Sequence, residues 1–229
     1  PVPGSAQIVQ FGLFPKEKIV YKNDEVRLWD IGDDVLCLEF TSKMNAIGAG
    51  ILQGVQDAIG IAEEGSWRGL VIGNNSKNFT VGANLMLIAM LAYEQEFDEL
   101  NRAVDLFQKT TMRCRYSKIP VVAATQGYVF GGGCEMIMHC DATSISAESY
   151  IGLVEVGVGL LPGGGGTKEF AVRISDSFYE GDVQIPTLIE RFKTIATASV
   201  ATSAYEAFDY GYLNGKDEVV MYQPEAIYK

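Results

Sequence analysis

The sequence predicts an α/β fold in which helices cover a sheet, and three observations favour it. Short β-rich apolar segments alternate along the chain with longer segments whose apolar residues recur at helical spacing. Glycine clusters stand between several of these segments, where tight turns are needed. The 229 residues, 48% of them hydrophobic and 21% charged, suffice for one domain with a substantial core. A layered α/β domain is therefore expected.

The chain opens with a predicted β-meander. Apolar segments at residues 19–21, 25–30 and 35–40 are separated by clusters of Asn, Asp and Gly, which are turn signals. Residues before Lys18 show no periodicity. We therefore expect a linker-like segment over residues 1–17 and one domain over residues 18–229.

Helical and extended patterns alternate through the next part of the chain. Residues 45–64 place apolar side chains on one helical face, and Asn45 is the predicted N-cap of this helix. A strand is predicted at residues 70–72 and a polar, glycine-bearing loop at residues 73–84. Residues 98–115 again repeat apolar positions at helical spacing, which predicts a second long helix.

The most informative stretch combines a strand, a glycine turn and a helix with two carboxylates. The apolar segment at residues 120–124 reads as a buried strand, and the glycines at residues 131–133 come directly before a helical pattern. A helix that begins at such a turn presents unpaired N–H groups to a ligand oxygen. Glu135 falls in the first turn of this helix. Glu155 lies in an otherwise apolar segment, where a charged side chain is expected to have an ionic partner or a functional role.

A second glycine run, at residues 163–166, is interpreted as a set of tight turns. A phosphate loop would need Lys and then Ser or Thr after its last glycine, whereas here Thr167 precedes Lys168. Thr167 is instead the predicted N-cap of a helix through Val172, and a short strand is expected at residues 141–146. His139, the one histidine of the sequence, is expected to be a hydrogen-bonded structural residue, because no G-x-S-x-G elbow accompanies it.

Composition excludes several classes of protein. The formal net charge of −11 disfavours a nucleic-acid surface, which would need clustered Lys and Arg. No apolar run approaches the length of a membrane-spanning helix. The four cysteines lack CxxC spacing, so we expect reduced core thiols, no metal site and a cytoplasmic location.

The motifs together resemble a known family. GYVFGGGCE over residues 127–135 and IGLVEVGVGLLPGGGGT over residues 151–167 are similar to the enoyl-CoA hydratase, or crotonase, superfamily. The resemblance runs in consistent order from about residue 35 to residue 213 and includes SKMNA at 42–46, NFTVGAN at 78–84 and AYEAFDYGYL at 204–213. It implies a crotonase-like spiral of ββα units. It also implies that the chain ends before the C-terminal helices that the family uses for packing.

The resemblance assigns roles to particular residues. The backbone amides of Ala83 and Gly132 would form an oxyanion hole for a thioester carbonyl. Glu135 would act as the base on a water molecule and Glu155 as the acid, without a metal or redox cofactor. Substrate-binding roles are implied for Lys43, Ala46 and Gly82. The alternative for Lys43 is an ordinary solvent-exposed loop lysine.

The expected function is hydration of the 2,3 double bond of an enoyl-CoA in fatty-acid β-oxidation, with coenzyme A as part of the substrate. Alternatives are an isomerase, a thioester hydrolase, or a non-catalytic acyl-CoA-binding or assembly module of a multifunctional protein. Asn84 departs from the acid frequently found after the oxyanion alanine. The last third of the chain is similar to crotonase domains fused to a 3-hydroxyacyl-CoA dehydrogenase. A fused dehydrogenase domain and a second copy of the chain are therefore further candidate partners.

Overall fold

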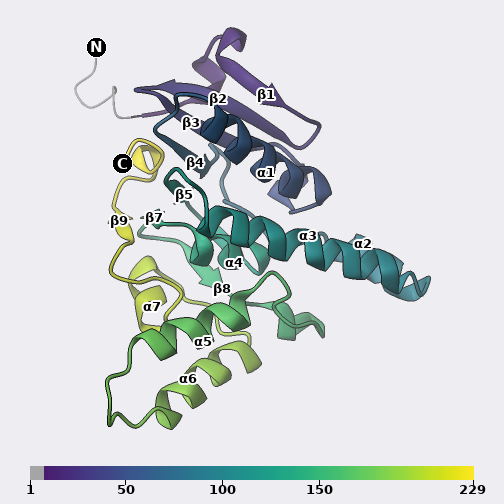
Figure 1. Cartoon of the computed structure of the whole chain (residues 1–229), viewed down its shortest axis with the longest axis vertical. Helices are drawn as coiled ribbons and strands as arrows, with labels where there is room; N and C mark the ends of the chain where they lie inside the picture. Colours follow the sequence, from purple (N-terminus) through teal and green to yellow (C-terminus); the bar gives the residue numbers. More distant parts are fainter. Residues whose placement is uncertain (1–7) are drawn as a thin grey trace.

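The computed structural model of the chain describes residues 8–229 and shows an α/β fold built on one long sheet. Figure 1 shows the sheet crossing the molecule from the N-terminal hairpins to the C-terminal segment. The strands follow the order β1-β2-β3-β4-β5-β7-β9. Their bounds are β1 (Ile19–Lys22), β2 (Val26–Gly32), β3 (Val35–Phe40), β4 (Gly69–Gly73), β5 (Val121–Thr125), β7 (Ala142–Ser146) and β9 (Glu218–Val220).

The first strands form the predicted meander, and the rest of the sheet is parallel. β1 pairs with β2 and β2 with β3 in antiparallel register, as turn-linked neighbours do. From β3 onward every pairing, through β4, β5, β7 and β9, is parallel. Parallel neighbours need crossover connections, and helices supply most of them.

A second, short layer completes a spiral of ββα units. β6 (Tyr128–Phe130) and β8 (Tyr150–Gly152) pair in parallel, and Thr80 bridges to Val129 on the other side of β6. The chain therefore passes repeatedly from a strand of the long sheet to a strand of the short layer and then into a helix. This repetition confirms the expected crotonase-like architecture.

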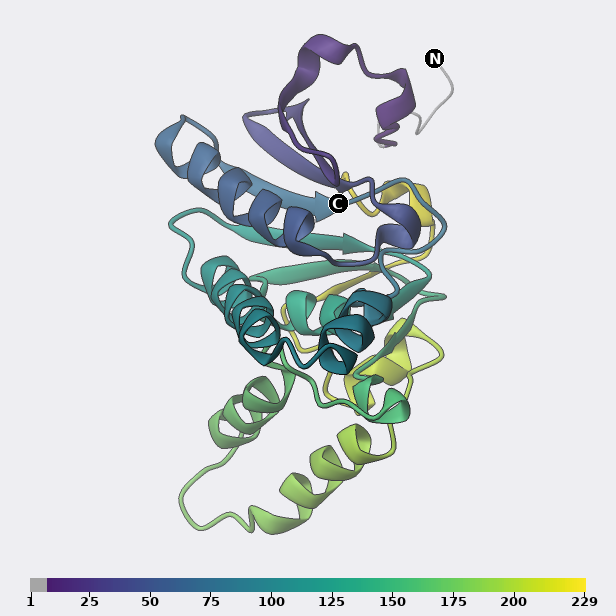
Figure 2. The ribbon, with the colours of Figure 1, turned by 90° about the vertical axis from the view of Figure 1, so that its right-hand side faces the viewer.

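The helices cover one face of the long sheet and continue below it. α1 (Ala49–Glu64), α3 (Phe97–Arg115) and α4 (Gly132–His139) pack in sequence beside the sheet, as Figure 2 shows. The remaining helices are α2 (Leu85–Tyr93), α5 (Gly166–Asp176), α6 (Ile185–Ala196) and α7 (Ala204–Asp209). Between sheet and helices lies the main core, with side chains such as Leu36, Leu38 and Ile59 fully buried.

The opposite face of the sheet is covered by the two ends of the described chain. Phe11 stacks on Trp29 with ring centroids 5.5 Å apart, and its N–H donates to Asn75. Ala226 and Ile227 join the same cluster. Residues 8–17 of the segment expected to be linker-like thus pack against the sheet, whereas residues 1–7 lie outside the described part. The division at residue 17 itself stays a prediction.

Two predicted N-caps are wrong. α1 begins after Gly48, and Asn45 instead lies in a turn with φ of 54°, where its amide donates to the Asn78 carbonyl. α5 begins after Gly165, with Thr167 already inside the helix. In both places a contact with a distant segment decides where the helix starts, and a local pattern does not contain that contact.

Candidate active site

Three parallel segments of the short layer end at the same place. The segment 79–83 runs beside β6, with Phe130 N–H donating to Thr80 O, and β6 runs beside β8. Parallel strands direct their carboxyl ends to one edge, where clefts of α/β folds form. Ala83 ends the first of these segments, and Gly132 and Glu155 follow shortly after β6 and β8, so the topology gathers the predicted site residues at one edge.

The two predicted oxyanion turns press against each other. A Cβ on Gly82 would lie 3.0 Å from Phe130 O, and one on Gly131 would lie 3.9 Å from Gly82 Cα. Both glycines have positive φ, 95° and 52°, which an L side chain would strain. Within residues 8–229, the hydrogen bonds found involve neither the Ala83 amide nor the Gly132 amide, the latter in the first turn of α4. Two N–H groups thus stay available at this edge.

Glu135 is buried in α4, and its carboxylate is held by the turn before α5. Only 1% of the residue is exposed. Its Oε2 accepts from Gly164 N–H at 3.0 Å, and its Oε1 accepts from Gly166 N–H at 2.8 Å. Burial raises the pKa of Glu135, while the N–H groups of Gly166, Gly164 and Gly165 favour the ionised form and limit that rise.

Glu155 opens the short 3₁₀ turn η5 (Glu155–Val158) and faces the oxyanion turn. A Cβ on Gly131 would lie 2.9 Å from Glu155 Oε1, so only glycine leaves room there for the carboxyl group. Its Oε2 is buried and has no hydrogen-bond partner among the described residues. Burial first, and then the negative charge of Glu135, raise the pKa of Glu155 to about 7. The two carboxyls are therefore electrostatic neighbours with different tendencies to hold a proton.

The residues predicted to bind substrate lie on one side of this edge. Gly82 is buried in the turn described above, and Ala46 precedes Ile47, whose N–H donates to Gly82 O at 2.8 Å. Lys43 begins the exposed turn η4 (Lys43–Asn45) that leads to Ala46. The structure therefore brings Ala46 and Gly82 together and leaves the Lys43 ammonium in solvent near them.

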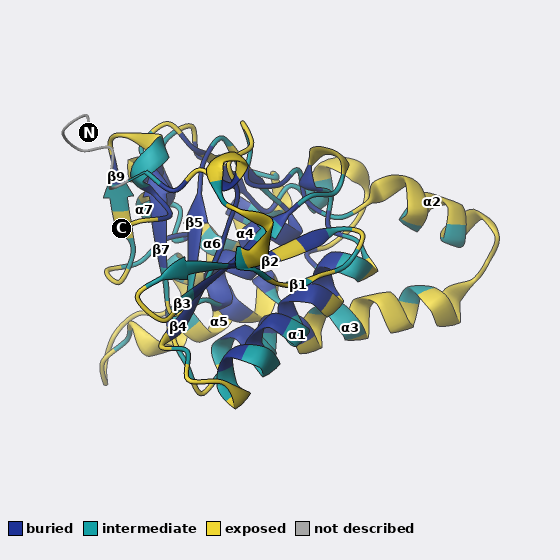
Figure 3. Cartoon of the chain, turned by 90° about the horizontal axis from the view of Figure 1, so that it is seen from above, coloured by how far each residue is buried: buried dark blue, intermediate teal, exposed yellow. Residues whose placement is uncertain are grey.

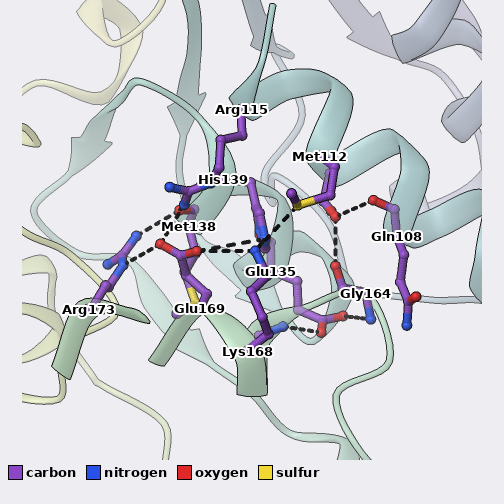
Figure 4. Close-up of polar contacts among 12 residues, drawn as sticks. Gln108, Met112, Arg115, Glu135, Met138, His139, Gly164, Lys168, Glu169 and Arg173 are labelled. Carbon is purple, nitrogen blue, oxygen red and sulfur yellow. Dashed lines mark hydrogen bonds and ion pairs between the residues drawn. The ribbon is translucent and has the colours of Figure 1, made fainter. Parts of the chain in front are cut away.

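His139 is tied into the fold from both ring nitrogens, as Figure 4 shows. Nδ1 lies 2.7 Å from Glu135 O, a carbonyl that can only accept, so Nδ1 carries the proton. Nε2 lies 2.8 Å from Lys168 Nζ and accepts from it. Burial lowers the pKa of His139 to about 4, and the ring is neutral at ordinary pH. These contacts fit the structural role expected for His139.

Beside His139 lies an ionic cluster that sequence reasoning missed. Glu169 is 2% exposed and pairs with Arg115 and, at 3.0 Å, with Arg173. Arg173 also donates to the carbonyls of Met138, Gly211 and Tyr212, which ties α5 to α4 and to the segment after α7. Arg115 stands 54 positions before Glu169, and no local pattern links them.

The glycine run at 163–166 was interpreted as tight turns alone, and that interpretation needs correction. Its amides hold the Glu135 carboxylate, so the run belongs to the candidate site. A Cβ on Gly164 would lie 2.7 Å from Glu135 Oε2, so a side chain there would displace the carboxyl group. The signal available in the sequence was the position of this run at a helix N-terminus, where free N–H groups meet anions.

The fold and these groups define a class of protein: a crotonase-fold domain with two free amides beside two carboxyl groups. Comparison with known proteins agrees with this class. The family described as enoyl-CoA hydratase/isomerase matches residues 32–190. The chain therefore belongs to the enoyl-CoA hydratase/isomerase family.

Curated relatives are longer than this chain. A Bacillus subtilis protein named "Probable 3-hydroxyacyl-CoA dehydrogenase" is 41% identical over 210 residues, which is 92% of this chain and 26% of that protein. A Rickettsia felis protein with the provisional name fatty acid oxidation complex trifunctional enzyme is 29% identical, again over 26% of its length. The chain thus spans about a quarter of these relatives.

Solved structures share the fold at low sequence identity. An enoyl-CoA hydratase from Polaromonas sp. JS666 has a TM-score of 0.72 at 21% identity, with 88% of this chain and 72% of that chain covered. An enoyl-CoA hydratase from Thermoplasma volcanium has a TM-score of 0.71 at 23% identity, with 89% and 75% covered. Among residues 8–229, no helix is long and apolar enough to cross a membrane.

Proposed function

We propose that the chain is a hydratase domain that adds water across the 2,3 double bond of an enoyl-CoA thioester in fatty-acid β-oxidation. The observation that carries this proposal is the pair Glu135 and Glu155, whose surroundings separate their protonation, beside the two free amides of Ala83 and Gly132. Hydration needs one base, one acid and a site for a developing oxyanion. The pair and the amides supply these three groups.

In the proposed reaction Glu135 takes a proton from water, and the water oxygen bonds to Cβ of the enoyl group. The electron pair of the double bond moves toward the thioester, and the amides of Ala83 and Gly132 stabilise the negative charge on its oxygen. Glu155 then gives its proton to Cα. The enzyme returns to its starting state when the proton held by Glu135 passes to Glu155. No electron is transferred, so no redox cofactor is needed, and coenzyme A enters as part of the substrate.

Apolar side chains that follow the Ala83 turn and line the Gly163 turn suit a fatty-acyl chain. α2 directly follows Asn84 and consists of Leu, Met, Ile, Ala and Tyr, none of them buried. Val104 of α3 approaches Gly163, and the exposed Leu161 stands just before that turn. Figure 3 shows α2 and the adjacent end of α3 as a largely exposed arm. An acyl chain laid here would remove part of this apolar surface from water.

The longer relatives support a further part of the proposal, namely that this domain works beside a 3-hydroxyacyl-CoA dehydrogenase in one chain. Hydration of an enoyl thioester produces a 3-hydroxyacyl thioester, which is the substrate that a dehydrogenase of this name oxidises. The reduced thiols Cys37, Cys114 and Cys134 are buried and suit a cytoplasmic protein. Alternatives are an isomerase, a thioester hydrolase, and a module that binds acyl-CoA without turnover.

The first prediction tests the pair directly by steady-state hydration of crotonyl-CoA and longer enoyl-CoAs, followed by ultraviolet absorbance. Glu135→Gln and Glu155→Gln should each lower kcat by roughly 100-fold or more, because an amide neither takes a proton from water nor gives one to carbon. Acyl-CoA binding, measured by calorimetry, should be largely kept. Both groups act on one water, so the double variant should lose much less than the product of the single losses.

Distinct results separate the alternatives. Single variants that turn over like wild type would remove the catalytic assignment. A wild-type protein that binds acyl-CoA and never hydrates it would favour the binding module, whereas release of free coenzyme A would favour the hydrolase.

A further inference from the structure

α3 contacts both halves of the candidate site with uncharged side chains. Phe107 packs on the oxyanion turn so closely that a Cβ on Gly132 would lie 2.4 Å from its Cζ. One residue further along, Gln108 Nε2 donates to Gly163 O at 2.9 Å. One helical turn from Gln108, the buried Thr111 hydroxyl lies 2.7 Å from Gly164 O and 3.0 Å from Gln108 O, and its single proton is assigned to the shorter contact, with Gly164. Gln108 and Thr111 thus hold two consecutive carbonyls of the turn that binds Glu135.

Because of peptide geometry, these two contacts also orient the N–H groups of the turn. A peptide unit is planar and trans, so its C=O and its N–H point in opposite directions. The Gly163 carbonyl shares a peptide unit with Gly164 N–H, and the Gly164 carbonyl shares one with Gly165 N–H. Gln108 holds the Gly163 carbonyl, and the Gly164 N–H of the same peptide donates to Glu135 Oε2 at 3.0 Å. Thr111 holds the next carbonyl, that of Gly164, and the Gly165 N–H of that peptide favours the ionised form of Glu135 without a direct hydrogen bond to it among the described residues.

The turn itself has little stiffness of its own. It consists of four successive glycines, which impose the weakest backbone preferences of any residue. Gly165 has a φ of 112°, and a Cβ there would lie 3.0 Å from the His139 ring. The orientation of the turn must therefore come from contacts with its neighbours, and besides Glu135 itself Thr111 supplies a buried one.

We propose that Gln108 and Thr111 together are positioning residues: they fix two consecutive peptides of the glycine turn, one of which donates directly to Glu135, and so favour the ionised form of this carboxyl group and hold it toward the water. The inference deepens the proposed hydratase function and rests on it for its kinetic readout. Thr111 is fully buried and acts through the glycine turn. Peptide dipoles set in advance need no reorganisation during the reaction, which is how such groups assist catalysis.

The titratable groups around Glu135 differ in the direction and size of their pKa shifts. Glu155 in η5 has its pKa raised to about 7, and His139 on α4 has its pKa lowered to about 4. Burial raises the pKa of Cys134 well above its usual range. Lys168 of α5 reaches His139, and α3 places only uncharged groups against the turn. The acidic limb of a pH profile for hydration reports the coupled pair Glu135 and Glu155, and a substitution in the glycine turn's supports should move it through Glu135.

Thr111→Val tests the proposal, with Thr110→Val as its matched control. Thr110 is the next residue of α3 and is equally buried, but its hydroxyl donates to Leu106 O and accepts from Gln56, away from the turn. In Thr111→Val, kcat at pH values on the acidic limb of the pH profile should fall by roughly three- to tenfold, and this limb should move to higher pH. KM should stay within about twofold of wild type. Gln108→Met should move the acidic limb in the same direction. Thr111→Ser, which keeps the hydroxyl group, should leave the limb at its wild-type position. Thr110→Val should lower Tm without moving the limb.

A second readout does not require turnover. The Glu135 carboxyl, followed by ¹³C NMR in glutamate-labelled protein and assigned with Glu135→Gln, should titrate at higher pH in Thr111→Val than in Thr110→Val. If wild type hydrates no enoyl-CoA, the proposed function fails while this titration still decides the positioning role. The inference is overturned if Thr111→Val and Thr110→Val titrate alike, or if Thr111→Ser behaves like Thr111→Val.

Discussion

At the scale of single residues, the two glutamates differ in what surrounds them rather than in chemistry. Glu135 receives main-chain N–H groups on both carboxylate oxygens, which favours its ionised form. Among residues 8–229, one buried oxygen of Glu155 has no hydrogen-bond partner, and burial together with the charge of Glu135 favours its protonated form. Pairs of titratable groups pushed apart in this way are typical of acid–base sites.

The second prediction concerns the pH dependence that follows from Glu155. In the proposed reaction its acid form protonates Cα, and burial and the charge of Glu135 raise its pKa to about 7. The kcat/KM for hydration should therefore fall as pH rises above about 7, because the proton donor is lost. Replacing Glu135 by Gln removes the neighbouring charge, so Glu155 should then titrate at lower pH, measured by ¹³C NMR. A profile that stays level to about pH 9 would contradict the assigned role.

Sequence reasoning reached these residues through motif resemblance and could not reach their supports. Glu135, Glu155, Ala83 and Gly132 stand at recognisable positions within two motifs, and their roles stay predictions until tested. Thr111 and Gln108 stand in no motif, because what matters is a contact across 53 and 55 positions with the glycine turn. The buried Glu169 was missed for the same reason.

At the scale of elements, one glycine of α1 allows this helix to pack closely on the sheet. Its apolar face, expected from the sequence, is buried against β2, β3 and β4. Gly54 lies on this face, and a Cβ there would stand 2.5 Å from a methyl carbon of Val26. Gly60 lies on the same helix with nothing within 4 Å of a Cβ position. One glycine is thus required by packing, and the other is not.

The third prediction uses this pair. Gly60→Ala should stabilise the protein by about 0.5–1 kcal/mol, because alanine loses less backbone freedom on folding and meets no neighbour. Gly54→Ala should destabilise it by about 1–3 kcal/mol, since the added methyl overpacks the contact with β2. Urea unfolding of both variants and wild type measures the difference. Equal shifts of the same sign in the two variants would mean that the helix does not approach the sheet as described.

The sequence predicts whether a segment is a helix or a strand where its hydrophobic periodicity and its length agree. It does not predict the residues at which the element begins and ends. The meander and the helix ending at Arg115 follow directly from spacing. The three-residue strands β6 and β8 are too short to carry a periodic signal, and they exist because neighbouring segments pair with them. The site depends on these strands, so its geometry required the tertiary structure.

At the scale of the whole molecule, charge opposes the substrate that the site favours. The formal net charge is −11, and coenzyme A carries several phosphate charges of the same sign. Long-range repulsion of this kind is screened within roughly 8–10 Å at about 0.1–0.15 M salt. Local cations must offset it near the site, and exposed Lys43 is the predicted substrate-binding residue that can do so.

The last prediction follows from this opposition. Raising the salt concentration from about 10 mM to about 150 mM should lower KM for an enoyl-CoA, because the repulsion between the acidic protein and the anionic substrate is screened. Lys43→Gln should raise KM several-fold at low salt with kcat unchanged, since the predicted contact of this lysine is with a part of the substrate remote from the reacting carbons. The matched control is the enoyl thioester of pantetheine, which lacks the phosphates and should show neither effect. A KM that rises with salt for the CoA ester would mean that attractive contacts to phosphate outweigh the field of the whole molecule. An equal salt response of the two esters would assign the effect to the protein rather than to substrate charge.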